Sequence, residues 1–146
     1  MTKSAMDRQI ELRLLESDVR FTKGRKAVVA GLASAPGPLS AAELAETLDE
    51  RVPLSSLYRS LAVLEEAGVV AHHLGAKGLT RYELAEWLAG HHHHLVCVDC
   101  GSVSDVQIPP TQEESVRDLV AQIAALASFA PTDHALEIEG RCSRCA

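Results

Sequence analysis

Four cysteines stand in two pairs, and two residues separate the members of each pair. Cys97 and Cys100 form the first pair, and Cys142 and Cys145 form the second. A structural zinc ion prefers four tetrahedral ligands, and thiolates suit it. Disulfides, a redox pair or buried free cysteines are the alternatives, but a redox motif would need a thioredoxin-like βαβ context that the sequence lacks. The two pairs therefore predict one structural Zn²⁺ site that uses all four cysteines.

Four consecutive histidines, residues 91–94, come shortly before the first cysteine pair. A solvated polar run or an expression tag is the simpler explanation, although such tags are usually longer and terminal. In an extended segment alternate side chains face opposite ways, so the first and third histidines share one side, and the second and fourth share the other. One segment can therefore serve two metal sites, and each site needs further ligands from elsewhere.

Histidines and carboxylates outside the run could complete those two sites. The candidates are Glu83 with His72 or His73, Glu113 or Glu114, and His134. Imidazole with carboxylate suits Zn²⁺, Fe²⁺, Ni²⁺, Co²⁺ or Mn²⁺, and affinity alone does not choose among these ions. A catalytic zinc site would also use three such ligands and a water. No general base or substrate-pocket motif accompanies them, so we expect no enzyme and no small organic substrate.

Length and charge restrict the class of protein further. The 146 residues leave room for one ordinary domain or two small ones, and a hydrophobic fraction of 47% does not indicate disorder. No apolar run approaches the roughly 18 residues that a transmembrane helix needs, and the charged N-terminus is unlike a secretion signal. We therefore expect a cytoplasmic protein without a membrane partner, in which reduced thiols favour metal over disulfides.

The first part of the chain, residues 5–67, has the periodicity of amphipathic helices. Ser40 opens a capping box for a third helix, and Ser55 or Ser56 can cap a fourth. Residues 69–84 then read as a two-stranded hairpin. Helices followed by a hairpin are the layout of a winged helix-turn-helix domain.

Beyond a short connector, the C-terminal part mixes strands with one helix. The pattern predicts strands near the first cysteine pair, at 103–107 and at 134–139, and a helix over about 112–127. This part is too small to be stable on its core alone, so metal or dimerisation would supply what is missing. We predict an α+β fold, with a winged helix-turn-helix DNA-binding domain at 1–86 and a small α/β dimerisation domain with the four-cysteine zinc site at 87–146.

Several blocks of residues resemble the ferric uptake regulator (Fur) family, and most closely its zinc uptake branch. They are Arg20-x-Thr22-x-x-Arg25, Ser55-Ser56-Leu57-Tyr58-Arg59, Tyr82-Glu83, His91-His92-His93-His94-Leu95-Val96-Cys97-x-x-Cys100-Gly101, and His134 ahead of Glu139-Gly140-x-Cys142-x-x-Cys145. The resemblance covers almost the whole chain, and its last two blocks are the most specific. It implies a homodimeric, metal-dependent transcriptional repressor of metal uptake or homeostasis genes, which binds a palindromic double-stranded DNA operator.

The resemblance also implies how the metal ligands divide. The four cysteines hold structural zinc. Glu83, His92 and His94 match an interdomain sensing site, for which His72 is a candidate fourth ligand. The ligands of a further site are His91, His93, one of Glu113 and Glu114, and His134.

Several positions depart from the family pattern, and two of them bear most directly on which metal is sensed. Pro38 stands where iron-type members tend to have a histidine, and Ala85 stands where zinc-type members often have a cysteine. We expect a second, regulatory divalent metal, with Zn²⁺ favoured and Fe²⁺ as an alternative. A family member that senses Ni²⁺, or Mn²⁺ and peroxide, is a further alternative, and a metal-binding module without DNA function is another.

The predicted fourth helix would enter the major groove of DNA. Tyr58 can reach a phosphate or a thymine methyl group, and Arg59 a phosphate or a guanine. Ser55 and Ser56 lie at the helix N-terminus, where backbone N–H groups favour phosphate. A locally basic segment, despite the net charge of −6, would add non-specific attraction through Arg20, Lys23 and Arg25. A partly buried aromatic and an ordinary solvated face are the simpler alternatives.

Overall fold

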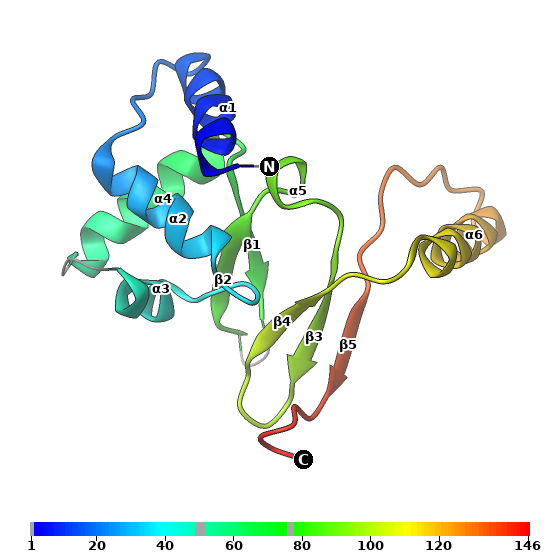
Figure 1. Cartoon of the computed structure of the whole chain (residues 1–146). Helices are drawn as coiled ribbons and strands as arrows, with labels where there is room; N and C mark the ends of the chain where they lie inside the picture. The colour runs from blue at the N-terminus through cyan, green and yellow to red at the C-terminus, as the bar shows by residue number, and fades with distance from the viewer. Residues whose placement is uncertain (1, 49–51, 76–77) are drawn as a thin grey trace.

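The computed structural model describes residues 2–48, 52–75 and 78–146, and its N-terminal part is a group of helices followed by a hairpin (Figure 1). Its elements are α1 (Lys3–Leu15), α2 (Lys23–Ala33), α3 (Ala41–Thr47), α4 (Leu54–Glu66), β1 (Val70–Leu74) and β2 (Thr80–Leu84). β1 and β2 pair antiparallel. This is the winged helix-turn-helix arrangement that the sequence predicts. Residues 76 and 77, within the predicted hairpin, lie outside the described residues.

Side-chain caps start three of these helices. The capping residues are Thr2, Thr22 and Ser40, and the side-chain oxygen of each accepts a hydrogen bond from the backbone amide three residues later. The prediction for α4 was wrong, because this helix has no side-chain cap and begins directly after Pro53. Proline already fixes its own φ near the helical value, and Ser55 and Ser56 lie inside the first turn instead of ahead of it.

One apolar cluster, whose buried members lie between residues 10 and 88, holds the N-terminal part together. α4 contributes Leu57, Leu61 and Leu64, which are fully buried. Their spacing of four and three residues places them on one face of the helix. The exposed Tyr58 therefore lies on another face of α4, away from this core.

The C-terminal part contains a short helix, a three-stranded sheet and a long helix. Its elements are α5 (Glu86–Ala89), β3 (His93–Cys97), β4 (Val103–Val106), α6 (Pro110–Leu126) and β5 (Glu137–Gly140). The strand order is β4-β3-β5, with β3 antiparallel to β4 and parallel to β5. The parallel pairing brings the end of the chain beside the first cysteine pair.

Two elements of this part differ from the prediction. α5 lies where the sequence predicts only a connector, because Leu88 packs into the N-terminal cluster. The predicted boundary between residues 86 and 87 falls inside this helix, and the division into domains stays a prediction. The last strand begins at Glu137 instead of at residue 134, because His134 turns toward α6, where it contacts Glu113.

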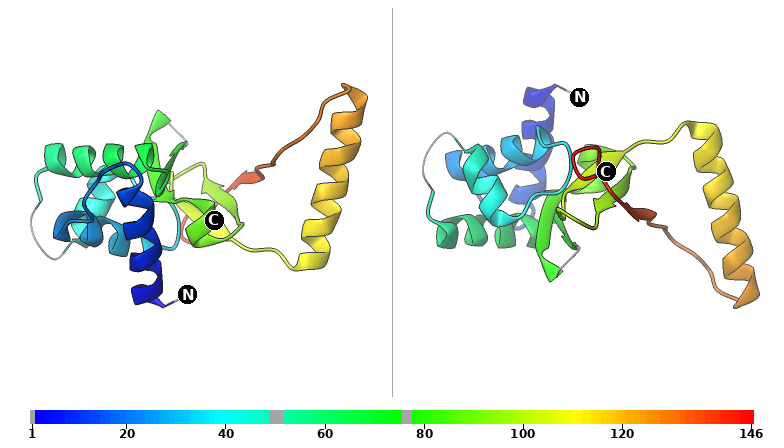
Figure 2. Two further views of the ribbon diagram at one scale, coloured as in Figure 1. Left: turned by 90° about the horizontal axis from the view of Figure 1, so that it is seen from above. Right: turned by 90° about the horizontal axis from the view of Figure 1, so that it is seen from below.

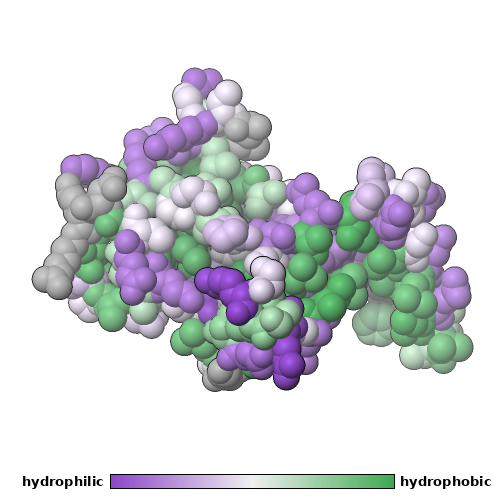
Figure 3. Space-filling view, turned by 60° about the horizontal axis from the view of Figure 1, so that its bottom comes forward, coloured by the Kyte–Doolittle hydropathy of each residue, from purple (hydrophilic) through white to green (hydrophobic). Residues whose placement is uncertain are grey.

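α6 lies apart from the three-stranded sheet, and extended segments join the two (Figure 2). Figure 3 shows hydrophobic residues gathered at the surface in this part of the molecule. The exposed apolar side chains in and after α6 are Leu119, Ile123, Leu126 and Phe129. Among the helices of the described ranges, none is long and apolar enough to cross a membrane.

Candidate metal centres and nucleic-acid interface

The four cysteines come together at one end of the three-stranded sheet. Cys97 is the last residue of β3, and its register partner in β5 is Gly140, two residues before Cys142. All four Sγ atoms lie within 4.8 Å of one another, and those of Cys100 and Cys142 are 3.8 Å apart. Gly101, with φ of +73°, adopts the left-handed conformation that the turn after Cys100 needs.

The acidity of these thiols is uneven. Backbone hydrogen bonds from Cys100 and Cys142 lower the pKa of Cys97 to about 6. The neighbouring sulfurs of Cys142, Cys100 and Cys97 raise the pKa of Cys145 to about 12. Without a cation the cluster therefore holds some thiolates and some thiols, because four adjacent anions repel one another. A closed set of four sulfur donors fits the tetrahedral demand of Zn²⁺, which would make all four thiolates compatible.

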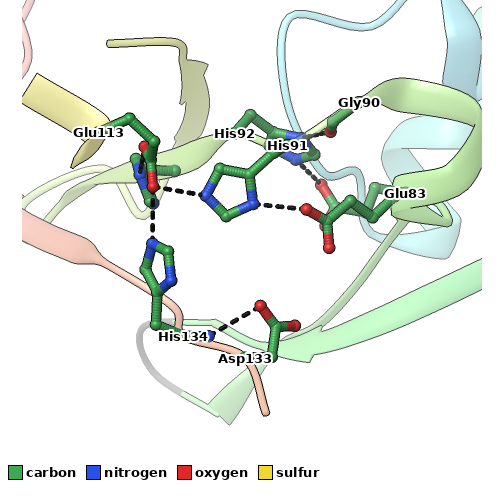
Figure 4. Close-up of polar contacts among 9 residues, drawn as sticks. Glu83, Gly90, His91, His92, Glu113, Asp133 and His134 are labelled. Carbon is green, nitrogen blue, oxygen red and sulfur yellow. Dashed lines mark hydrogen bonds and ion pairs between the residues drawn. The ribbon is translucent and has the colours of Figure 1, made fainter. Parts of the chain in front are cut away.

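A second cluster surrounds Glu113 on α6, and we call it the Glu113 cluster (Figure 4). Glu113 Oε1 lies 3.1 Å from His91 Nε2 and 2.8 Å from His134 Nε2, and Oε2 lies 2.8 Å from His93 Nε2. His93 is 2% exposed and Glu113 is 8% exposed, whereas Glu114 points to solvent. The structure thus brings together one of the two predicted carboxylates, Glu113, with all three predicted histidines.

A third cluster, which we call the Glu83 cluster, lies on the opposite side of β3. Its members are Glu83, His92, His94 and Asp105. Glu83 Oε2 lies 3.0 Å from His92 Nε2 and 3.1 Å from His94 Nε2. Asp105 Oδ1 lies 3.7 Å and 3.5 Å from the same two nitrogens. Glu83 lies in β2, His94 in β3 and Asp105 in β4, and His92 directly precedes β3. The cluster therefore joins the wing to the C-terminal sheet.

The structure does not bring His72 to the Glu83 cluster, because His72 points to Glu65 on α4 and contacts its carboxylate. The neighbouring His73 faces the cluster instead, where it contacts Glu83, and its ring centroid lies 4.5 Å from that of His94. Asp105 was missed by sequence reasoning. Its position in the strand predicted at 103–107 was the available signal, since an antiparallel neighbour of β3 places one residue directly opposite His94.

Ionisation in the Glu83 cluster is uneven, because only Glu83 is held in the charged form that a cation can use. Burial opposes the charge of Glu83, but hydrogen bonds from His73, His94 and His92 outweigh it and hold the pKa of this carboxyl far below its usual range. Burial raises the pKa of Asp105. Burial lowers the pKa of His92, but hydrogen bonds to the Gly90 carbonyl and to Glu83 outweigh it, so the pKa of His92 is raised. Two imidazoles and two carboxylates form a mixed donor set suited to Zn²⁺, Fe²⁺ or Mn²⁺.

One face of α4 carries the side chains predicted to touch DNA. Tyr58 is 51% exposed and Arg59 is exposed beside it. Arg59 Nη2 donates a hydrogen bond to the hydroxyl of Ser56 at 3.4 Å. Ser55 is exposed at the start of the helix, and Ser56 is half-buried.

The basic segment precedes and enters α2. Arg20 and Lys23 are exposed, and Arg25 is half-buried. The Nη1 group of Arg25 donates a hydrogen bond to the carbonyl of Arg20 at 2.6 Å, which folds this arginine back onto its own segment. Arg20 and Lys23 therefore present more of their side chains at the surface than Arg25 does.

A winged helix joined to a sheet that carries four-member clusters of cysteine, histidine and carboxylate donors defines a metal-binding protein of the winged-helix class. The ferric uptake regulator family model matches residues 16–139, which is most of the chain. The chain belongs to the ferric uptake regulator family.

Individual relatives agree with this membership. The ferric uptake regulation protein of Legionella pneumophila is 41% identical over 100 residues, which cover 66% of this chain and 65%, just under two thirds, of that protein. The crystal structure of the Vibrio cholerae ferric uptake regulator matches with a TM-score of 0.70 and 29% identity, over 88% of this chain and 96% of that one. A zinc uptake regulator in complex with zinc and DNA matches with a TM-score of 0.58 and 25% identity, over 99% and 94%.

Proposed function

We propose that this protein is a metal-responsive transcriptional repressor that binds DNA as a homodimer, and that the Glu83 cluster is its sensing site. One observation carries the proposal: Glu83 lies in the wing, whereas His94 and Asp105 lie in the C-terminal sheet. A cation held by all members of the cluster therefore cross-links the two parts of the chain. The zinc uptake regulator bound to zinc and DNA, which has the same fold, supports this proposal.

The cation acts by selecting one arrangement of the two parts. When the wing and the sheet are held at one angle, the two α4 helices of a dimer have one separation, and two half-sites of a palindromic operator fit at once. The cation can shift the population only by its difference in affinity between this arrangement and the others. Zn²⁺ is the favoured ion and Fe²⁺ the alternative, since both accept imidazole and carboxylate ligands.

The other two clusters have supporting roles. The four cysteines hold a structural Zn²⁺, because a closed four-thiolate site leaves no open position for a ligand. The Glu113 cluster is a further cation site that ties α6, through Glu113, to the strand with His93 and to the loop with His134. It fixes the long helix that the dimer needs.

The homodimer is supported by the exposed apolar residues of α6. Leu119, Ile123 and Leu126 are 54%, 57% and 89% exposed, and they are spaced three and four residues apart. Such a stripe on a helix that stands away from its own sheet indicates an interface, because soluble monomers rarely expose a large apolar patch. The edge strand β5 lies close to this helix in sequence and presents the exposed Ile138.

DNA binding is supported by the exposed face of α4. Tyr58 and Arg59 would contact base edges and phosphates in the major groove, with Ser55 and Ser56 near the phosphates at the helix start. Arg20, Lys23 and Arg25 would contribute backbone contacts that weaken as salt increases.

The test is operator binding with each metal separately. An operator is first selected from random-sequence DNA with zinc-loaded protein, and its affinity is then measured at fixed salt with Zn²⁺, Fe²⁺, Ni²⁺ or Mn²⁺ and without added metal. We expect one ion to raise the affinity strongly. His92→Ala should remove this response while four-cysteine zinc remains, because it deletes a ligand of the Glu83 cluster.

His72→Ala is the matched control, since His72 lies on the same hairpin as Glu83 but outside the cluster. It should respond to metal as the wild type does. Equal operator affinity of the wild type with and without every metal would exclude a sensor. The absence of any salt-dependent DNA affinity would instead identify a metal-binding module.

A further inference from the structure

We propose that the loop between α2 and α3, residues 34–38, is the joint that transmits the state of the Glu83 cluster to the DNA-binding part, with Gly37 and Arg81 as its positioning residues. We call this segment the docking loop. The inference rests on the proposed function, since it names the path by which a bound cation would orient the wing and α4.

The docking loop lies against the outer edge of β4. The backbone N–H of Asp105 donates a hydrogen bond to the carbonyl of Pro36 at 2.9 Å. Gly37 is buried beside the same strand, and a Cβ atom at this position would lie 2.3 Å from the carbonyl oxygen of Val103 and 2.9 Å from Ser104 Cα. Both neighbours are backbone atoms, so a side chain there could be accommodated only by moving the loop away from the strand.

The same segment continues directly into the wing. Leu39, one residue after the docking loop, exchanges two backbone hydrogen bonds with Tyr82, at 2.9 Å and 2.7 Å. Tyr82 precedes Glu83, and Asp105 is itself a member of the Glu83 cluster. Residues 36–39 therefore pair with both strands that supply carboxylates to the cluster. Pro36 bonds β4, which carries Asp105, and Leu39 bonds β2, which carries Glu83.

Arg81 adds a second connection between the two parts. This side chain of β2 is 5% exposed, and its guanidinium donates hydrogen bonds to the carbonyl of Gly101 at 2.9 Å and to that of Pro38 at 3.2 Å. It also pairs with the carboxylate of Glu43, which closes the capping box at the start of α3. One arginine thus contacts the docking loop, the helix-turn-helix and the turn after Cys100.

These contacts explain how a small change at the cluster can reach DNA. A cation that fixes Asp105 and Glu83 at one separation also fixes the two strands between which residues 36–39 lie. The docking loop connects α2 to α3, so the helix-turn-helix follows this separation as one body. The joint has no charged group at its closest point, Gly37, so it can be disrupted sterically without changing a ligand.

The decisive variant is Gly37→Ala, with Gly24→Ala as its control. Gly37 does not have a positive φ, so alanine suits its backbone and meets only the clash with β4. A Cβ at Gly24 would meet nothing within 4 Å.

Pro36→Ala keeps the carbonyl that Asp105 uses and should behave as the wild type does. Arg81→Lys keeps a positive charge near Glu43 but loses the planar fork that also reaches Gly101, so it should give an intermediate result.

Two measurements separate this inference from the proposed function. The first is hydrogen exchange of the Asp105 amide in DNA-free protein, which should be at least about tenfold faster in Gly37→Ala than in Gly24→Ala because its acceptor moves away. The second is the metal-induced gain in operator affinity, which should fall at least about fivefold in Gly37→Ala. By linkage, the operator-induced gain in metal affinity should fall by the same factor, whereas four-cysteine zinc and non-specific DNA affinity should not change.

The outcomes are distinct. If the wild type shows no metal response, the proposed function fails, and the exchange rate still decides whether the joint exists. If the wild type responds and Gly37→Ala responds equally, the inference is wrong although the sensor remains. Equal exchange of the Asp105 amide in both glycine variants would exclude the docking contact altogether.

Discussion

The two parts of this protein are held together by different forces. In the N-terminal part, the buried apolar residues from Ile10 to Leu88 form one continuous core. In the described part of the chain beyond residue 90, the buried apolar residues are only Val96, Cys97 and Ala124. The C-terminal part instead buries polar donors, among them His93 and Glu113.

This difference indicates what each part needs in order to fold. Burial of apolar surface stabilises the N-terminal part without a cofactor. A small sheet with few buried side chains cannot offset its loss of conformational entropy in the same way. In the proposed function, coordination of cations and association with a second copy would supply the missing free energy, which would couple folding, metal binding and dimerisation of the C-terminal part.

Removal of the proposed structural zinc should produce the largest difference in stability between the two parts. Cys142→Ser, or a strong chelator, should unfold the C-terminal part and leave the N-terminal helices folded, because zinc binding to such sites contributes about 10–16 kcal/mol of apparent free energy. Hydrogen exchange resolved by residue is the measurement. Ser143→Ala, in the same turn, is the control. Loss of protection at Leu57 and Leu61 to the same extent would show that the two parts are not independent.

Disruption of the α6 stripe should have the next largest effect. Ile123→Asp should shift the protein toward monomer, since two symmetry-related copies each lose about 1.5–3 kcal/mol of apolar burial. Sedimentation at several concentrations measures the change. Gln122→Asp adds the same charge one position earlier, and it should remain dimeric. A dimer that is unaffected by Ile123→Asp would place the interface elsewhere.

Truncation of a core side chain tests whether apolar burial stabilises the N-terminal part. Leu61→Ala should lower the free energy of unfolding of the N-terminal part by about 2–5 kcal/mol, because the fully buried Leu61 leaves a cavity. Denaturant unfolding followed by the fluorescence of Trp87, the single tryptophan, reports on this part, since its indole N–H bonds the Gly68 carbonyl. Leu15→Ala, which is 62% exposed in the wild type, should change stability little. Zinc content should stay the same in both variants.

Protonation of Glu43 should have the smallest effect. Burial opposes its charge, but the Ser40 amide and Arg81 lower the pKa of this carboxyl below the usual value. A lowered folded-state pKa gives stability that is present above the unfolded pKa of about 4.3 and is lost as pH falls through the folded value. Because the side chain is 42% exposed, the contribution should be below about 1 kcal/mol.

Glu43→Gln should therefore reduce the loss of N-terminal stability as the pH falls below the unfolded pKa of about 4.3. The same tryptophan fluorescence follows it. Glu46 is exposed on the same helix, and Glu46→Gln should keep the wild-type dependence of the free energy of unfolding on pH. If Glu43→Gln also kept that dependence, Arg81 would not stabilise the carboxylate of Glu43.

Periodic patterns and close spacing were readable from the sequence, whereas contacts between distant segments were not. The stripe of α4, the capping box of Ser40 and the alternation of the histidine run follow from local geometry, and the structure shows each of them. Asp105 was missed because its proximity to His94 depends on strand pairing. The choice between His72 and His73 was open for the same reason, since the pairing register of the hairpin decides which one faces Glu83. Ala71 pairs with Glu83, so His73, two residues later, lies on the same face as Glu83.

Four identical side chains in a row contain no information about which of them faces which way. A shift of one residue in the pairing of β3 would exchange the two sets of ligands, because successive residues of a strand alternate. The phase is set downstream, where Val96 pairs with Val103 and Cys97 pairs with Gly140. A single-residue insertion between His94 and Cys97 would therefore preserve every donor in the sequence and still interchange the two proposed cation sites.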